Sequence, residues 1–360
     1  MDIEVSKDDN HVTRRVMAPT ADPAAGQALL RIDSFGLSMN NASFAVLGDL
    51  MGYWKLFPAS EAAWGRVPVF GFADVIASRH PEVAEGTRLF GYLPMSTHLV
   101  VEPAKVGPRG FFDGTAHRRD VMASVWNHYQ DVSDTSPEER AGEARRSLLG
   151  PLFITGFLMD DFLADNGGFG AGTVVVSAAS SRTALALAWC LRRRGGCRVV
   201  GLTSSERRGV VADLDVYDDV RAYDEVDGLT GDRAVYVDFA GRVALRDAVH
   251  ARFGDGLVHS MIAGMSYIER PADVVLDPPA VGAPPDPFMA QLQVAKRARE
   301  WGQDVLDARR DVAWREFSAW TEGWLTITEG RGPDAVEAAW RALLAGDVDP
   351  AIGHQLSLWP

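Results

Sequence analysis

The sequence has few cysteines, which could form a disulfide or bind zinc, and no long apolar run, which could cross a membrane. Its 360 residues include two cysteines, Cys190 and Cys197. One lies inside a predicted helix and the other enters the next predicted strand, so we interpret both as small buried side chains and expect neither a disulfide nor a zinc site. We find no run of about 18 apolar residues and no signal-peptide pattern, and we therefore expect a cytoplasmic protein.

Excess positive charge is also missing. The formal net charge is -13, which would repel phosphate backbones and anionic lipid surfaces. The longest basic cluster, Arg192 to Arg194, is followed by two glycines, as at the C-terminus of a helix. We therefore expect no nucleic-acid partner and no membrane partner.

The length and the 47% hydrophobic content predict two domains, each with a core of its own. The first hundred residues carry short β-type runs separated by glycine and proline, which predicts a β-rich domain over residues 1–147. Within this domain, residues 109–146 are polar and charged. We interpret them as a partly helical insertion.

The next part of the chain alternates between helix and strand patterns. In residues 148–287, a helix is followed by apolar strand patterns separated by helical ones, which predicts a parallel sheet with right-handed crossovers in a Rossmann-like domain. Residues 288–360 hold six of the ten tryptophans, several at helical spacings. We expect this segment to be helical and to pack on the β-rich domain or on a second subunit.

The segment 172–208 has the strand, turn, helix and strand of a dinucleotide-binding unit. Such units usually carry G-x-G-x-x-G, whose glycines let the backbone approach the pyrophosphate at a helix N-terminus. Here the turn, residues 177–184, reads SAASSRTA without a glycine. Serine hydroxyls and a guanidinium can also hold a phosphate. The candidate cofactor ligands are therefore Ser180, Ser181, Arg182 and Thr183.

The second strand of this unit ends in TSSERR, residues 203–208. Hydroxyls and cations at this place favour the 2′-phosphate of NADP(H), whereas NAD usually meets an acidic residue there. Ser204, Ser205 and Arg208, with Arg207 beside them, are the candidate ligands, and Glu206 argues against them. The alternative is that the serines only cap a helix and that the turn no longer binds a dinucleotide.

Taken in order, these segments resemble the medium-chain dehydrogenase/reductase superfamily on its zinc-free, quinone-oxidoreductase-like side. The resemblance is carried by the stretches ALLRIDSFGLSMNN at 28–41, PVFGFADV at 68–75, LLGPLFITGF at 148–157, VDFAG at 237–241 and VHSMIAG at 258–264. It implies an α/β protein with a Rossmann nucleotide-binding domain and a β-rich, GroES-like catalytic domain. The insertion and the C-terminal part are closer to a bacterial branch known only as a domain of unknown function.

The resemblance also implies a cofactor and several residue roles. Where zinc members of the superfamily have a cysteine and Gly-His-Glu, this chain has Ser38 and the residues GFA at 71–73, which implies catalysis without a metal. Thr155 matches the threonine beside the nicotinamide, and Ala240 and Ala263 lie in the cofactor-facing turns. The implied cofactor is NADP(H).

Without a metal, reduction of a conjugated carbonyl or a quinone needs neutral donors to polarise the carbonyl and to supply a proton. The catalytic candidates are Asn40 and Tyr53, near the expected substrate pocket, and Asn127 and Tyr129 in the insertion. Tyr129 is the candidate proton donor. For each of them the alternative is an ordinary one, an asparagine in a turn or a tyrosine at a domain surface.

The neighbouring carboxylates of Asp160 and Asp161 are interpreted as surface charge, because adjacent helix residues point apart.

We therefore expect an NADPH-dependent, zinc-independent reductase of a small conjugated carbonyl or quinone, most simply a homodimer. Two alternatives stay open. One is a non-redox enzyme on the same fold that has lost nucleotide binding, and the other is a non-catalytic binding or scaffold protein. Tight binding of NADPH would favour the reductase over both.

Overall fold

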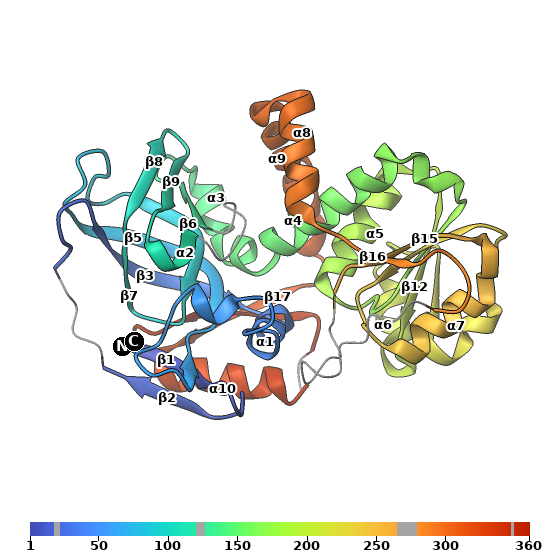
Figure 1. The fold of residues 1–360 in the computed structure, drawn as a ribbon, viewed down its shortest axis with the longest axis horizontal. Coiled ribbons are helices and arrows are strands. Elements are labelled where there is room, and N and C mark those ends of the chain that lie inside the picture. The colour runs from blue at the N-terminus through green and yellow to red at the C-terminus, as the bar shows by residue number, and fades with distance from the viewer. Residues whose placement is uncertain (18–21, 120–126, 265–278, 347–348) are drawn as a thin grey trace. The chain divides into compact units, whose positions relative to one another are not determined.

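The computed structural model describes residues 1–17, 22–119, 127–264, 279–346 and 349–360. The chain divides into two compact units, Met1–Leu148 with Leu325–Pro360, and Leu149–Trp324 (Figure 1). Each unit has its own sheet and its own hydrophobic core.

The first unit is β-rich. In the described part of the chain, its large sheet has nine strands in the order β17-β18-β3-β5-β6-β10-β9-β8, and β7 also pairs with β3. These strands are β3 (Ala28–Leu37), β5 (Pro68–Ser78), β6 (Arg88–Pro94), β7 (His98–Val101), β8 (Pro103–Gly107), β9 (Gly110–Asp113), β10 (His128–Asp131), β17 (Thr326–Arg331) and β18 (Ile352–Ser357). A small sheet joins β2 (Thr13–Val16), β1 (Asp2–Ser6) and β4 (Trp64–Gly65).

Short helices complete this unit. They are α1 (Met39–Val46), η1 (Tyr53–Lys55), α2 (Ala116–Arg119), α3 (Pro137–Ala141) and α10 (Gly332–Leu344). Helix α10 packs against β17 and β18 and buries Trp340 completely, whose indole N–H donates to the carbonyl of Asn10 at 2.9 Å. The core of the unit is thus closed by residues far apart in the sequence.

The second unit is a parallel α/β structure. Its described sheet has the order β13-β12-β11-β14-β15-β16, and all of its strand pairs are parallel. The strands are β11 (Thr173–Val176), β12 (Arg198–Thr203), β13 (Asp219–Ala222), β14 (Ala234–Asp238), β15 (Leu257–Ile262) and β16 (Pro285–Pro287). Every residue of β11 and β14 is buried, as expected for strands covered on both faces. The predicted fold class is confirmed.

The connections of the second unit are helical. They include α4 (Glu143–Asp165), which starts in the first unit, and then η3 (Gly167–Gly170), α5 (Arg182–Arg194), η4 (Ser205–Arg207), α6 (Arg208–Asp213), η5 (Tyr223–Gly228), α7 (Val243–Phe253), η6 (Gly254–Gly256), α8 (Ala290–Trp301) and α9 (Gln303–Thr321). Helix α5 follows β11 directly after the turn at 177–181, so its N-terminus lies at the carboxyl end of the parallel sheet.

By length and composition, helix α4 could cross a membrane. However, 61% of its most apolar stretch of 18 residues is buried inside the structure. It also carries Asp160 and Asp161, and their interpretation as surface charge is wrong because both are buried. Arg194 of α5 donates two hydrogen bonds, of 2.8 and 2.6 Å, to the carboxylate of Asp160. Arg297 of α8 donates to the carboxylate of Asp161 at 2.6 Å. We interpret α4 as a core helix whose adjacent carboxylates pair with different neighbours.

The expectation for residues 288–360 needs two corrections. Helices α8 and α9 belong to the second unit, where Phe317 stacks on Phe153 at 4.9 Å. The remaining part contributes two strands besides α10, since β17 pairs with β18 and β18 pairs with β3. Helical spacing of aromatic residues identifies a buried face, but it does not say which core that face joins.

The insertion at 109–146 is partly helical, as predicted, but it also extends the sheet. Strand β10 pairs with β6 on one side and with β9 on the other. Helix α3 starts at a capping box, in which Ser136 and Glu139 exchange hydrogen bonds with each other's backbone. Residues 120–126 of this insertion, with Val125 and Trp126, lie outside the described residues.

Candidate functional site

The turn between β11 and α5 keeps the shape of a glycine turn without a glycine. Ala178 adopts the left-handed conformation, with φ of 46°, which costs an alanine about 1–2 kcal/mol. The N–H of Ser181 closes the turn on the carbonyl of Ala178 at 2.7 Å. The hydroxyl of Ser181 then caps α5 by accepting from the N–H of Ala184 at 3.4 Å. The turn is therefore a strained but ordered structure.

A glycine in the next strand makes room for this turn. A Cβ on Gly201 of β12 would lie 2.8 Å from the Cβ of Ala179 and 3.1 Å from ring atoms of Tyr217. The hydroxyl of Tyr217 donates to the carbonyl of Ala179 at 3.0 Å. The turn thus has no glycine of its own, and Gly201 in the adjacent strand leaves the space that the turn needs.

Two buried polar residues fix the ends of β11 and β14. The hydroxyl of Ser177 donates to the carboxylate of Asp238 at 2.6 Å and accepts from the N–H of Phe239 at 2.9 Å and of Ala240 at 3.0 Å. The N–H of Ala263 donates to the carbonyl of Asp238 at 2.8 Å. The backbone N–H groups of the cofactor candidates Ala240 and Ala263 therefore already donate hydrogen bonds within the fold. These residues can line a cofactor site, but their amides are not available to the cofactor.

Two guanidinium groups belong to the turn region. Arg207 of η4 reaches back from the end of β12 and donates to the hydroxyl of Ser180 at 3.5 Å. Arg182, the first residue of α5, is half-buried, and burial lowers its pKa to about 10. A desolvated cation gains when an anion lies beside it. The arrangement therefore favours an anionic ligand at the turn.

The other predicted 2′-phosphate ligands have different partners. Arg208 donates to the carbonyl of Val220 at 3.1 Å and to Glu225 at 3.0 Å, so its guanidinium is held by β13 and η5. The carboxyl of Glu206 accepts from its own backbone N–H and from the hydroxyl of Ser204, and these bonds lower its pKa. The contacts favour Arg207 over Arg208 as a phosphate ligand.

Three further cofactor candidates have simpler surroundings. Ser205 is exposed in η4, and Thr183 is half-buried in the first turn of α5. The hydroxyl of Thr155 donates to the carbonyl of Pro151 in its own helix at 3.1 Å. A hydroxyl bound in this way can still accept a hydrogen bond from a ligand.

In the first unit, two neighbouring asparagines differ in availability. Asn41 is buried, and its side chain accepts from the N–H of Ser38 at 2.8 Å and donates to the carbonyl of Pro68 at 2.9 Å. Asn40 is half-buried on α1, and we find no side-chain hydrogen bond for it among the described residues. Asn40 is thus the amide that can serve a ligand.

The other retained catalytic candidate is Tyr53 of η1. Its ring lies 4.3 Å from that of Phe44, which follows Asn40 by one turn of α1, so both candidates lie on the same side of that helix. Burial raises the pKa of Tyr53 to about 12. The phenol therefore stays protonated at neutral pH.

The interpretation of Tyr129 and Asn127 as catalytic groups is corrected by their surroundings. The hydroxyl of Tyr129, 1% exposed, donates to the carbonyl of Tyr92 at 2.7 Å and accepts from Arg118 at 2.8 Å. The amide of Asn127 donates to the carbonyl of Arg118 and accepts from its Nε, and Arg118 also pairs with Asp113 at 2.9 Å. Because the proton of Tyr129 is committed to a backbone carbonyl, we assign both residues to a buried network that anchors the insertion.

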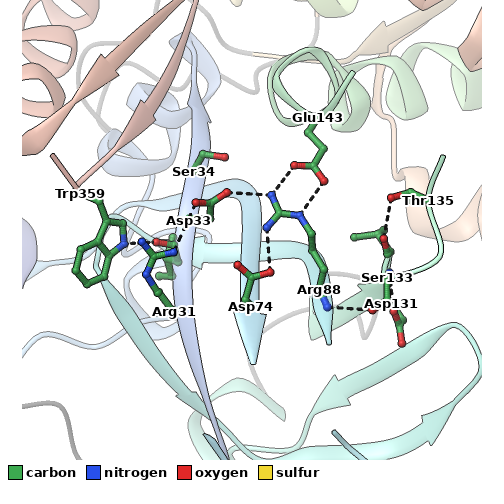
Figure 2. Close-up of polar contacts among 12 residues, drawn as sticks. Arg31, Asp33, Ser34, Asp74, Arg88, Asp131, Ser133, Thr135, Glu143 and Trp359 are labelled. Atoms are coloured by element: carbon green, nitrogen blue, oxygen red, sulfur yellow. Dashed lines mark hydrogen bonds and ion pairs between the residues drawn. The ribbon is translucent and has the colours of Figure 1, made fainter. Parts of the chain in front are cut away.

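Sequence reasoning missed Arg88, which fixes the start of α4 to the sheet (Figure 2). This buried side chain donates to Glu143 of α4 at 2.8 Å, to Asp74 of β5 at 3.0 Å and to Asp33 of β3 at 2.9 Å. The three carboxylates raise its pKa well above the usual value. They come from segments far apart in the sequence, so no local pattern marks this cluster.

The family model described as "Protein of unknown function (DUF2855)" matches residues 35–349. The chain belongs to this family. No curated protein matches it.

Solved structures show what fold this DUF2855 member shares. CurA from Vibrio vulnificus in complex with NADPH has a TM-score of 0.58 at 15% identity, over 96% of this chain and 93% of that one. Mycobacterial Rv1454c complexed with NADPH has 0.56 at 17%, over 99% and 98%. The yhdH oxidoreductase from Salmonella enterica in complex with NADP has 0.53 at 14%, over 99% and 99%. At this identity the likeness shows the fold alone, and in the fold it confirms the predicted resemblance. The family match confirms the branch of unknown function.

The second unit of this DUF2855 chain fits a dinucleotide phosphate. The turn keeps the left-handed backbone at Ala178 and carries small side chains around it. Arg207 brings a cation to Ser180. The carboxylate of Glu206, which would repel a phosphate, is held by its own backbone N–H and by the hydroxyl of Ser204. Among the described residues, no group of three or more histidine, cysteine, aspartate or glutamate side chains is arranged to hold a metal ion.

Proposed function

We propose that the chain is an NADPH-dependent, zinc-independent reductase of a small conjugated carbonyl or a quinone. The observation that carries the proposal is the contact between Arg207 and Ser180, because it brings a cation to the turn at which Rossmann-like units bind the phosphates of a dinucleotide. Two relatives in fold are described as complexes with NADPH and one as a complex with NADP, and they support this choice of cofactor.

In this proposal, side chains replace the backbone contacts of a glycine-rich turn. The hydroxyls of Ser180 and Ser181 and the guanidinium of Arg182 bind the pyrophosphate, and Arg207 binds the 2′-phosphate. Charge-assisted hydrogen bonds of this kind are about twice as strong as neutral ones, which can compensate for the methyl and hydroxymethyl groups that keep the backbone at a distance.

The cofactor supplies a hydride when it is bound. The amide of Asn40 donates a hydrogen bond to the substrate carbonyl and stabilises the negative charge that develops on that oxygen. With the hydride delivered to the carbon β to the carbonyl, the protonated phenol of Tyr53 would supply a proton to the α carbon. The carbon–carbon double bond becomes single, and solvent reprotonates Tyr53.

We also propose that the protein acts as a cytoplasmic homodimer on a small-molecule substrate. The acidic net charge of -13 supports a partner other than nucleic acid or lipid. Light scattering during gel filtration tests the dimer, and a single species with the mass of one chain would contradict it.

Two contacts favour the alternative, a non-redox enzyme or scaffold on the same fold. Ser181 already caps the amide of Ala184, and the carboxylate of Glu206 occupies the hydroxyl of Ser204. Both groups use donors that a bound dinucleotide needs. On this alternative, the turn is a closed structure that binds no nucleotide.

The reductase proposal is tested by following NADPH deuterated at the transferable position. With a panel of small enones and quinones, we expect NADPH oxidation and one deuterium in the product by mass spectrometry. Asn40→Ala and Tyr53→Phe are expected to lower kcat/KM by roughly 10²-fold or more each, whereas Asn166→Ala, an exposed change in the second unit, leaves it unchanged. Absence of turnover and of label over the whole panel would contradict the proposal.

A further inference from the structure

One peptide group of the turn between β11 and α5 is fixed from the side of the neighbouring strands. The N–H of Ala179 donates to the carbonyl of Leu202 in β12 at 3.0 Å. The carbonyl of Ala179 accepts from the buried hydroxyl of Tyr217 at 3.0 Å. The peptide group that joins Ala179 to Ser180 therefore has its carbonyl oxygen turned toward the interior of the second unit.

Tyr217 itself has a well-defined position. The residue after it, Asp218, pairs with Val199 of β12: its N–H donates to the carbonyl of Val199 at 2.8 Å, and its carboxylate accepts from the N–H of Val199 at 2.7 Å. The ring of Tyr217 lies over Gly201, where a Cβ would come within 3.1 Å of the ring atoms. Burial raises the pKa of Tyr217 well above its usual value, so the phenol stays a hydrogen-bond donor at neutral pH.

The bond from Tyr217 also sets the direction of the next backbone N–H. In a trans peptide group the N–H points opposite to the carbonyl, so the N–H of Ser180 points away from the interior. Ser180 is half-buried, and we find no acceptor for its N–H among the described residues. The hydroxyl of the same residue accepts from Arg207 at 3.5 Å. Ser180 thus combines an available backbone donor with a nearby cation.

This orientation is one of two that the turn could adopt. The N–H of Ser181 donates to the carbonyl of Ala178 at 2.7 Å, so residues 178–181 form a β-turn with the Ala179–Ser180 peptide group at its centre. Turns of types I and II differ by roughly a half-turn of this central peptide group, and type II needs a positive φ at the third residue. That residue, Ser180, does not have a positive φ. Its side chain and the bond from Tyr217 therefore favour the same orientation, whereas a glycine at this position would accept both.

We propose that Tyr217 is a positioning residue for the cofactor, which acts through the carbonyl of Ala179 to orient the N–H of Ser180 toward the pyrophosphate. The inference rests on the proposed function, in which side chains of this turn bind the pyrophosphate, and it adds one backbone donor to them. A bond from an N–H to a phosphate oxygen is charge-assisted. Because the peptide group is already oriented, this bond forms without the cost of ordering the turn.

The first test is calorimetry of NADPH and NADH with the full chain and with Tyr217→Phe, which keeps the ring over Gly201 and removes the hydroxyl. Both nucleotides contain the pyrophosphate, so we expect both affinities to fall by roughly tenfold. The preference for NADPH, which the proposed function assigns to Arg207, should stay. The matched control is Tyr129→Phe, which removes another buried hydroxyl that donates to a backbone carbonyl, in the first unit, and should change neither affinity.

The second test separates the orientation of the peptide group from a packing defect. Ser180→Ala and Ser180→Gly both remove the hydroxyl, but only glycine lets the peptide group turn over. With Tyr217 present, we expect the two variants to bind NADPH equally. In combination with Tyr217→Phe, Ser180→Gly should bind NADPH roughly tenfold more weakly than Ser180→Ala, whereas a packing defect would weaken both alike.

The third test needs no variant, and it keeps the inference falsifiable if Tyr217→Phe does not fold. In NMR spectra of the wild type with isotopically labelled serine, the amide proton of Ser180 should move downfield when NADPH is added, as for a new bond to a phosphate oxygen. A wild type that binds neither nucleotide would overturn the proposed function and this inference with it. Binding of NADPH without a change at the Ser180 amide, or with equal affinity in the wild type and Tyr217→Phe, would overturn this inference alone.

Discussion

The methyl group of Ala179 lies over Gly201, where a Cβ would come within 2.8 Å of it. This relationship explains how a nucleotide-type turn forms without glycine: the missing small residue is in the neighbouring strand. Carbon atoms essentially never come closer than about 3 Å to such a Cβ, so a side chain at Gly201 would force the surrounding atoms to shift.

Gly201→Ala should therefore destabilise the protein by about 1–3 kcal/mol, as overpacking does. Ala179→Gly in the same chain should recover part of the loss, because it removes the atom that the new methyl group meets. Urea unfolding of the four proteins of this double-mutant cycle measures the coupling. Additive effects would show that the two residues do not compete for one space.

The left-handed backbone at Ala178 predicts the opposite effect for a glycine. Ala178→Gly should stabilise the protein by up to about 1 kcal/mol, because glycine adopts this conformation without strain. The matched control is Ala184→Gly, inside α5, which should cost about 1 kcal/mol. If both variants lose stability equally, Ala178 is not strained.

Glu206 is expected to weaken NADPH binding, since its carboxylate is fixed by Ser204 in the loop that would receive the 2′-phosphate. Glu206→Gln should raise the affinity for NADPH by roughly three- to tenfold, the effect of removing one nearby like charge. The affinity for NADH, which has no 2′-phosphate, should change little. A larger gain for NADH than for NADPH would place Glu206 elsewhere in the site.

Arg88 is the polar residue whose loss should cost most in the first unit. Arg88→Met leaves the carboxylates of Asp33, Asp74 and Glu143 without their shared cation (Figure 2). Breaking a buried ion pair from one side costs about 3–5 kcal/mol. Arg192→Met, which removes the exposed ion pairs with Asp215 and Asp218, should cost less than about 1 kcal/mol. Denaturant unfolding of both variants measures the two losses, and equal losses would contradict the role given to Arg88.

Acid should destabilise the protein through its histidines. Burial lowers the pKa of His250 and of His259, so the unfolded chain binds protons more readily than the folded one. This contribution is complete above the usual histidine pKa of about 6.5 and is lost as the pH falls below it. His259, whose ring stacks on Phe169 at 4.1 Å, can be isolated with His259→Phe. Between pH 5 and 8, the free energy of unfolding should fall less steeply with acid in this variant than in the wild type. An identical fall in both would exclude a role for His259.

The sequence predicts the parallel unit well because buried strands such as β11 and β14 have apolar runs that periodicity detects. It predicts the site less well. The pattern that marks Tyr129 as a proton donor shows a hydroxyl in the chain but not the carbonyl of Tyr92 that takes its proton. Likewise, Gly201 and Arg88 act through neighbours in space, which a linear pattern does not contain.

Titration calorimetry of NADPH and NADH against the wild type, Arg207→Gln and Arg208→Gln tests the central claim most directly. Arg208 lies in the same loop but is held by Glu225, so it is the matched control. We predict that the wild type binds NADPH at least roughly tenfold more tightly than NADH, that Arg207→Gln loses this preference and that Arg208→Gln keeps it. Absence of binding by either nucleotide to the wild type would contradict the account and leave the fold without its expected cofactor.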